Sequence, residues 1–217
     1  MIRNAIFDWS GTLVDDLEPV WRSTNYTLRQ AGVPEMSLAT FRAEFSLPFD
    51  AFYERVTPGV SLDQLEVWYK ESFIEEQMAV RSLPHAEAFV HYCRELGMRT
   101  YLLSTIHPDH YQVQSARVRF EFDHEYIRVM DKRIKIGEIL KMNGLAADET
   151  VFFGDMQHDV ETAKAGGIFS CGVLTGYNTK EQLEAAKPDL IVESLADIHR
   201  HWETHGANLE LRLNHHE

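Results

Sequence analysis

The sequence predicts a three-layer α/β fold, in which helices cover both faces of a parallel sheet, with a helical domain inserted into it. Short apolar runs alternate with helical patterns from residue 81 onward, whereas residues 17–80 show helical patterns only. Alternating strands and helices are typical of βαβ units with right-handed crossovers. We therefore expect the sheet domain at 1–16 and 81–200, the helical insertion at 17–80 and a polar, irregular tail at 201–217.

The first strand and the first helix are the earliest elements expected. Residues 2–7 form a short apolar run that suits a buried strand. Apolar residues then recur at helical spacing over 17–31, and Asp15 and Glu18 have the spacing of a capping box for this helix. Gly32 is placed to end it.

Three more helices are expected in the insertion. Ser37, Pro48 and Ser61 are placed to begin them, because Ser caps helix N-termini and Pro fits the first turn. The helices would span 38–46, 48–56 and 62–79.

The rest of the chain alternates between the two kinds of element. Strands are predicted at 99–104, 125–129, 150–155, 170–174 and 189–192. Helices are predicted at 85–96, 108–117, 133–143, 158–165 and 179–186. The strand at 150–155 is the clearest, because β-branched and aromatic residues dominate it.

The composition excludes several classes of function. Asp and Glu number 34 against 21 Lys and Arg, a formal net charge of −13 that repels nucleic acid and anionic membranes. The chain has neither a run long enough for a transmembrane helix nor a signal peptide, so we expect a cytoplasmic protein. Cys93 and Cys171 are expected to be buried thiols in a reducing compartment. Five histidines are expected to be solvated in the irregular tail: His199, His201, His205, His215 and His216.

Carboxylates follow two of the predicted strands. Asp8 and Asp155 each end a strand, and Asp159 comes four residues after Asp155. Because ligands of open parallel sheets bind beyond the carboxyl ends of the strands, these groups are expected to meet. Few, hard oxygen ligands suit Mg²⁺, whose remaining positions take water and substrate phosphate. Ser104 at a third strand end and Lys132 before a helix are placed to hold phosphate oxygens.

In this order the motifs resemble those of the haloacid dehalogenase superfamily of hydrolases, near its phosphoglycolate phosphatase-like branch. The run Asp8–Thr12 (DWSGT) resembles the first motif, and Gly154–Asp159 (GDMQHD) resembles the fourth. Ser104 and Lys132 match the less specific second and third motifs. The resemblance covers about residues 2–195 and implies a Rossmann-like core with a helical cap inserted between the first two motifs.

The resemblance implies a Mg²⁺-dependent phosphatase-type hydrolase that acts on a small phosphorylated metabolite. Asp8 would be the nucleophile and would form an aspartyl-phosphate. The implied Mg²⁺ ligands are Asp8, Ser10 (through its backbone carbonyl), Asp155 and Asp159. The implied catalytic residues are Asp8, Ser10 and Lys132, and the implied phosphate-binding residues are Thr12, Ser104 and Thr105. Lys132 would also contact phosphate oxygens, and Lys135 is a competing candidate for its role.

Position 10 departs from the family pattern. Most phosphatases of this family carry a second Asp there, which protonates the leaving alkoxide, and loss of a general acid costs about 10²–10⁴ in rate. Ser10 could be tolerated by substrates with good leaving groups, such as acyl phosphates. Alternatively, His107, His110 or His158 could replace the acid. A third alternative is a catalytically weak or inactive phosphate- or metal-binding protein on the same fold.

Other branches of the superfamily fit less well. Phosphonoacetaldehyde hydrolase-like enzymes need a lysine in the second cap segment, which is 38–57 here. Lys70 lies on the last cap helix instead. Dehalogenases carry Tyr at position 10, and phosphomutases need the missing Asp. Phe45, Arg42 and Arg55 are the cap residues expected to contact the leaving group. A homodimer is compatible with the sequence, which does not indicate the oligomeric state.

Overall fold

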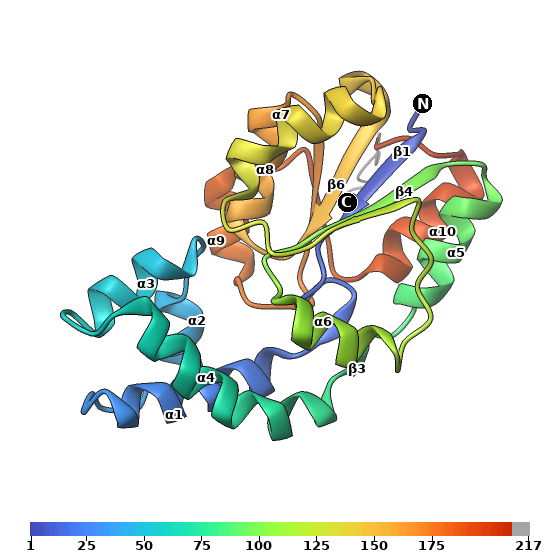
Figure 1. The fold of residues 1–217 in the computed structure, drawn as a ribbon. Coiled ribbons are helices and arrows are strands. Elements are labelled where there is room, and N and C mark those ends of the chain that lie inside the picture. The colour runs from blue at the N-terminus through green and yellow to red at the C-terminus, as the bar shows by residue number, and fades with distance from the viewer. Residues whose placement is uncertain (210–217) are drawn as a thin grey trace, which may run out of the picture.

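A six-stranded parallel sheet forms the centre of the computed structural model, which describes residues 1–209 (Figure 1). The strand order is β5-β4-β1-β6-β7-β8, and each neighbouring pair is parallel. The strands are β1 (Asn4–Phe7), β4 (Arg99–Leu103), β5 (His124–Tyr126), β6 (Thr150–Gly154), β7 (Phe169–Val173) and β8 (Leu190–Val192). The predicted α/β fold with a parallel sheet is confirmed.

Helices cover both faces of this sheet (Figure 1). Ile6 of β1 belongs to an apolar cluster with Ile139 of α7, whereas the next residue, Phe7, packs against Phe89 of α5 on the opposite face. Because both faces are covered, every residue of β1 and β6 is buried. The helices of this domain are α5 (Ala86–Glu95), α6 (Pro108–Ser115), α7 (Lys132–Asn143), α8 (Gln157–Gly166), α9 (Lys180–Ala186) and α10 (Leu195–His205), with a short 3₁₀ helix, η2 (Ala147–Glu149).

Four helices form the insertion at one end of the sheet, at the lower left of Figure 1. They are α1 (Leu17–Gln30), α2 (Leu38–Glu44), α3 (Phe49–Val56) and α4 (Leu62–Glu76), followed by the 3₁₀ helix η1 (Gln77–Ala79). Helix α1 packs along α4. Two short antiparallel strands, β2 (Val14–Asp15) and β3 (Arg81–Ser82), join the chain where it enters and leaves these helices. We refer to residues 17–80 below as the cap.

Two expectations about local structure are wrong. His199, His201 and His205, predicted in an irregular tail, lie on α10, because a capping box at Ser194 begins a helix whose apolar residues face the core. His215, His216 and the other residues from 210 onward lie outside the described residues. The predicted capping box at Asp15 is also absent, since Asp16 is the N-cap of α1 and makes no capping hydrogen bond.

Cys93 and Cys171 are free, buried thiols, as predicted. Within residues 1–209, no helix has the length and apolar character needed to cross a membrane.

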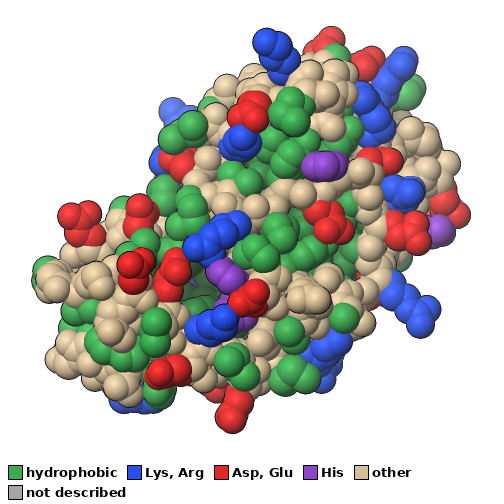
Figure 2. Space-filling model, in the orientation of Figure 1, with side chains coloured by type: hydrophobic (Ala, Val, Ile, Leu, Met, Phe, Trp, Pro, Cys, Tyr) green, Lys and Arg blue, Asp and Glu red, His purple; other side chains and the backbone are tan. Residues whose placement is uncertain are grey.

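A cavity of about 470 Å³ lies between the cap and the carboxyl end of the sheet. Asp8 and Ser10 line one part of it, and side chains of the cap helices line much of the rest. Figure 2 shows a hollow on this face, with hydrophobic side chains inside it and charged side chains and histidines around its mouth.

Candidate active site

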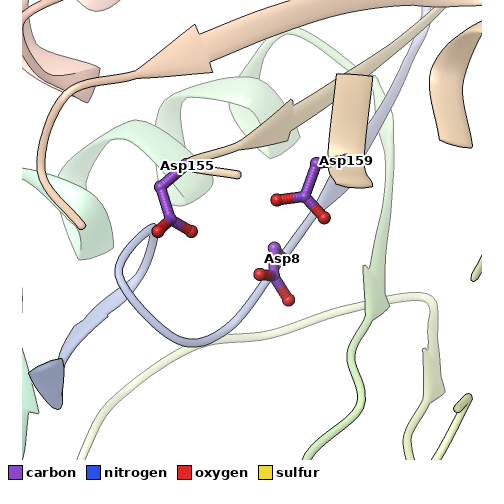
Figure 3. Close-up of side chains that lie close together, drawn as sticks. All are labelled: Asp8, Asp155 and Asp159. Atoms are coloured by element: carbon purple, nitrogen blue, oxygen red, sulfur yellow. The ribbon is translucent and has the colours of Figure 1, made fainter. Parts of the chain in front are cut away.

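Three carboxylates meet at the carboxyl end of the sheet (Figure 3). Asp8 follows β1, Asp155 follows β6, and Asp159 lies in the first turn of α8. Their ligand oxygens lie within 4.8 Å of one another, and all three residues are buried. Strand register explains the first two positions: Phe7 pairs with Phe153, so the residues that follow β1 and β6 are neighbours.

Lys132 lies between two of these carboxylates. Its side chain is fully buried, and Nζ is 2.7 Å from Asp8 Oδ1 and 2.8 Å from Asp159 Oδ1. Asp131 caps the N-terminus of α7 by accepting a hydrogen bond from the Arg133 amide. Burial alone would lower the pKa of Lys132, but attraction to Asp159 and Asp8 outweighs it and holds the pKa above its usual value. The lysine therefore stays charged.

Lys135, the competing candidate, lies on the exposed side of α7. Its ammonium pairs with Glu138 one turn along the same helix. The geometry therefore favours Lys132 over Lys135 as the lysine of the site.

The carboxylates carry more charge than Lys132 balances. Burial raises the pKa of Asp8 to about 6, although Lys132 opposes this shift. Burial, together with repulsion from Asp159 and Asp8, holds the pKa of Asp155 well above its usual value. Both shifts mean that burial, together with repulsion between the carboxylates, disfavours the ionised forms. A hard divalent cation such as Mg²⁺ fits this set of oxygen donors and would supply compensating positive charge.

Asp155 is fixed by two loops that approach it closely. Thr12 Oγ1 donates to Asp155 Oδ1 at 3.1 Å, and the Tyr177 amide donates to Oδ2 at 2.7 Å. A Cβ at Gly11, where φ is +70°, would be 2.5 Å from Asp155 Oδ2, and one at Gly176 would be 2.1 Å away. These loops need glycine because a side chain would displace the carboxylate.

The predicted phosphate-binding residues differ in access to the cavity. Thr105 and Ser10 line it beside Asp8. Thr12 is buried, and its hydroxyl donates to Asp155. Ser104 is also buried, and its hydroxyl accepts a hydrogen bond from the Ile106 amide at 3.2 Å. Thr12 and Ser104 thus hold neighbouring parts of the site in this structure, whereas Thr105 and Ser10 face the cavity.

The three histidines proposed as replacement acids also differ in whether they line the cavity. His107 and His110 line the cavity from the start of α6. His158 is 3% exposed, and its Nε2 accepts a hydrogen bond from the backbone amide of Lys132. His158 is absent from the cavity lining, so the geometry does not support it as an acid for the leaving group. Burial lowers the pKa of His110 to about 4, so its ring is neutral at pH 7.

Asp16 is a residue of the site that the sequence analysis missed. Its carboxylate lines the cavity and accepts a hydrogen bond from the Tyr177 hydroxyl, at 3.1 Å, and the nearby Ser10 hydroxyl also favours its ionised form. Burial raises the pKa of Asp16 to about 7 against the effect of these hydrogen bonds. Asp15, the last residue of β2, is exposed, whereas Asp16 at the N-cap of α1 is buried, and the sequence alone does not distinguish these adjacent acids.

Of the cap residues expected to contact a leaving group, Phe45 lines the cavity, whereas Arg42 and Arg55 do not. Arg42 donates to the backbone carbonyls of Tyr177, at 2.8 Å, and Asn178, at 3.1 Å. Arg55 pairs with Glu44 on the cap surface. The geometry therefore does not support either arginine as a contact for the leaving group, because backbone and acidic groups within the protein already engage them.

Comparison with known proteins identifies the family. The model of the haloacid dehalogenase-like hydrolases matches residues 5–173. A 5′-nucleotidase of Pseudomonas aeruginosa is 24% identical over 93% of this chain and 96% of its own length. A phosphoglycolate phosphatase of Pectobacterium atrosepticum is 40% identical over 60 residues, which are 28% of this chain and 26% of that protein.

A similar fold is found in the crystal structure of a predicted phosphatase from Clostridium acetobutylicum. The TM-score is 0.82 at 19% identity, and the match covers 94% of this chain and 100% of the other. The family model spans most of the sheet domain and the whole cap, including Asp8 and the Gly154–Asp159 motif. The resemblance seen in the sequence is confirmed: this chain belongs to the haloacid dehalogenase-like hydrolases.

Proposed function

We propose that this hydrolase is a Mg²⁺-dependent phosphatase of small phosphorylated metabolites, with Asp8 as the nucleophile. The observation that carries the proposal is the position of Asp8: its carboxylate lines the cavity, contacts Lys132 and belongs to the three-carboxylate cluster. The names of the two relatives, a 5′-nucleotidase and a phosphoglycolate phosphatase, support a phosphate monoester as the substrate.

In the proposed reaction, an Asp8 carboxylate oxygen attacks phosphorus and the bond to the leaving oxygen breaks. The electron pair stays on the leaving oxygen, which takes a proton from solvent. Lys132 keeps Asp8 ionised and oriented, and its ammonium is placed to stabilise negative charge on the transferring group. Thr105 and Ser10 are the proposed contacts for phosphate oxygens. Water then attacks phosphorus, which releases phosphate and regenerates the Asp8 carboxylate.

The proposed Mg²⁺ ligands are Asp8, the Ser10 backbone carbonyl, Asp155 and Asp159. When bound there, Mg²⁺ would offset the repulsion between the anionic nucleophile and the anionic substrate. Thr12 and Tyr177 would contribute by keeping Asp155 in place.

Ser10 is the observation that favours a second candidate. Its hydroxyl cannot act as the carboxylic acid that most relatives carry, so the fold could serve as a phosphate- or metal-binding protein. The same residue would permit turnover of acyl phosphates, whose leaving groups need little protonation.

Hydrolysis of acetyl phosphate and 4-nitrophenyl phosphate, with Mg²⁺ and with a chelator, separates the two candidates. We expect Mg²⁺-dependent turnover that falls by at least about 10³-fold in Asp8→Asn, as for loss of a catalytic nucleophile. Asp15→Asn, which removes an exposed acid nearby, is the matched control and should retain turnover. Failure to hydrolyse either compound, with Asp8→Asn behaving as the wild type does, would contradict the phosphatase proposal and favour the binding protein.

A further inference from the structure

The cavity beside Asp8 is largely apolar. Its volume of about 470 Å³ lies within the range of roughly 300–1,000 Å³ that is typical of small-molecule sites. Aromatic and aliphatic side chains of the cap form one wall: Phe45, Phe49, Tyr53, Leu65, Tyr69 and Phe73. A two-carbon leaving group would leave most of this surface in contact with water. A larger apolar group would cover it, and removal of this apolar surface from water would favour binding.

The lysine and arginine side chains that line the cavity already have acidic partners. Lys70 Nζ is 2.6 Å from Asp109, and Arg128 lies 3.8 Å from Glu66. Among the described residues that line the cavity, these two are the lysine and arginine side chains. His110 adds no charge at pH 7, because burial lowers its pKa. A second anionic group on the substrate would therefore lose its water without gaining a free cation.

Gln114 provides a polar group without a partner. The residue is 2% exposed and lines the cavity, and its Oε1 accepts a hydrogen bond from the Trp9 indole at 2.7 Å. The amide nitrogen Nε2 is buried and has no hydrogen-bond partner. A buried N–H without an acceptor is unfavourable, so a ligand acceptor that reaches Nε2 would be favoured.

We propose that the site takes phosphate monoesters of uncharged, ring-containing alcohols that offer a hydrogen-bond acceptor to Gln114. The proposal rests on the proposed function of Asp8, and it names the substrate class of that same site. The ring would pack against the aromatic wall of the cap. Asp8 forms the bond to phosphorus, the ester P–O bond breaks, and its electron pair stays on the alcohol oxygen, which takes a proton from solvent.

A matched set of substrates tests the proposal on the wild-type protein. Benzyl phosphate, its methoxycarbonyl derivatives and its carboxy derivatives share one leaving-group type and differ in charge and in acceptors. We expect kcat/KM for the best methoxycarbonyl isomer to exceed that of its carboxy counterpart by at least about tenfold, a difference of 1.4 kcal/mol. Benzyl phosphate should also exceed 2-phosphoglycolate. Preference for the carboxy compounds or for phosphoglycolate would overturn the proposal.

Binding of phosphonates tests the cavity without turnover. Calorimetric titration in Mg²⁺ should show tighter binding of benzylphosphonate than of phosphonoacetate, and the reverse order would contradict the proposal. Acetyl phosphate separates a test of the phosphatase function from a test of the substrate class. Turnover of acetyl phosphate through Asp8, combined with preference for charged leaving groups, would leave the phosphatase function standing and remove the substrate class alone.

Gln114→Leu tests the acceptor, with Gln112→Leu, an exposed glutamine of the same helix, as the matched control. The Gln114 variant should lower kcat/KM for the methoxycarbonyl substrate about fivefold to tenfold more than it lowers kcat/KM for benzyl phosphate, as expected for one hydrogen bond. The control should change neither. Equal losses for both substrates would assign Gln114 a structural role instead. The wild-type substrate set remains decisive if the variant fails to fold.

Discussion

Lys132 is the residue on which the electrostatics of the site depend. It is a fully buried cation between Asp8 and Asp159, each within 2.8 Å of Nζ. Burial of such a group is costly and is offset only when its partners are close and well oriented. Removal of one partner from a buried ion pair typically costs about 3–5 kcal/mol, because it leaves the other charge uncompensated.

Lys132→Met should therefore impair both activity and folding, whereas Lys135→Met should impair neither. We expect the first variant to lose at least about 10²-fold in kcat, as for loss of a group that stabilises the transition state, and about 3–5 kcal/mol in the free energy of unfolding. The second variant should stay within about 0.5 kcal/mol of the wild type, because its ion pair is exposed. Urea unfolding and acetyl phosphate hydrolysis measure the two effects. Similar losses in both variants would contradict this assignment.

At the residue scale, the sequence predicts where the carboxylates of the site lie better than it predicts which other side chains lie beside them. Asp8 and Asp155 can be placed because strand ends meet at one edge of a parallel sheet. The choice between Lys132 and Lys135 depends on how α7 packs against the sheet, which local pattern does not determine. Gln114 lies 105 residues along the chain from its partner Trp9, so its orientation follows from tertiary packing alone.

At the scale of elements, Arg42 joins cap helix α2 to the sheet domain. Its guanidinium donates to the carbonyls of Tyr177 and Asn178, in the loop after β7, and its own carbonyl accepts from Gln182 at 3.2 Å. The same loop holds Asp155 through the Tyr177 amide. One short segment therefore contacts both the cap and a carboxylate of the site.

Arg42→Ala should loosen the cap, and Arg55→Ala is the matched control on the neighbouring helix α3. Hydrogen bonds of a charged group contribute about 1.5–3 kcal/mol, so the first variant should show faster amide exchange in α2 and a KM raised about tenfold. The second variant loses an exposed ion pair with Glu44, which typically contributes only about 0–1 kcal/mol. Hydrogen exchange and steady-state kinetics measure these effects. Unchanged exchange in α2 of Arg42→Ala would show that other contacts hold the cap.

The elements that sequence analysis missed had weak or misleading local signals. Helix α10 carries three histidines, and this polar composition obscured the helical spacing of Leu195, Ile198 and Trp202. All three side chains are buried, and the Trp202 ring lies 5.4 Å from that of Phe89. Strands β2 and β3 have two residues each and pair with each other although the whole cap lies between them in the sequence. Neither could therefore be found from local periodicity.

At the scale of the molecule, the buried carboxylates link stability to pH. Burial raises the pKa of Asp8 to about 6 and that of Asp16 to about 7, and it also raises the pKa of Asp155. The unfolded chain has ordinary values near 4, so between about pH 4 and pH 7 the folded state binds more protons than the unfolded state. The contribution of these groups to the free energy of unfolding is therefore largest in acid and declines as the pH rises through that range.

Mg²⁺ should reverse this decline. Without metal, we expect the contribution of the site to the free energy of unfolding to be smaller at pH 8 than at pH 5. Mg²⁺ at a hundredfold excess over its dissociation constant should then add about 2.7 kcal/mol at pH 8. At pH 5 the same Mg²⁺ concentration should add less, because protons compete for Asp8 and Asp155. Thermal unfolding with Mg²⁺ and with a chelator at both pH values measures the stabilisation by Mg²⁺ and its dependence on pH.

Asp155→Asn provides the control that assigns the effect to the site. It removes one charge from the cluster, so the metal-free variant should be less sensitive to pH than the wild type, and its stabilisation by Mg²⁺ at pH 8 should largely disappear. Asp15→Asn, on the exposed side of β2, should retain both the pH response and the response to Mg²⁺. Equal stabilisation of all three proteins by Mg²⁺ would place the metal elsewhere, because only a cation held by the buried cluster depends on Asp155 and not on Asp15.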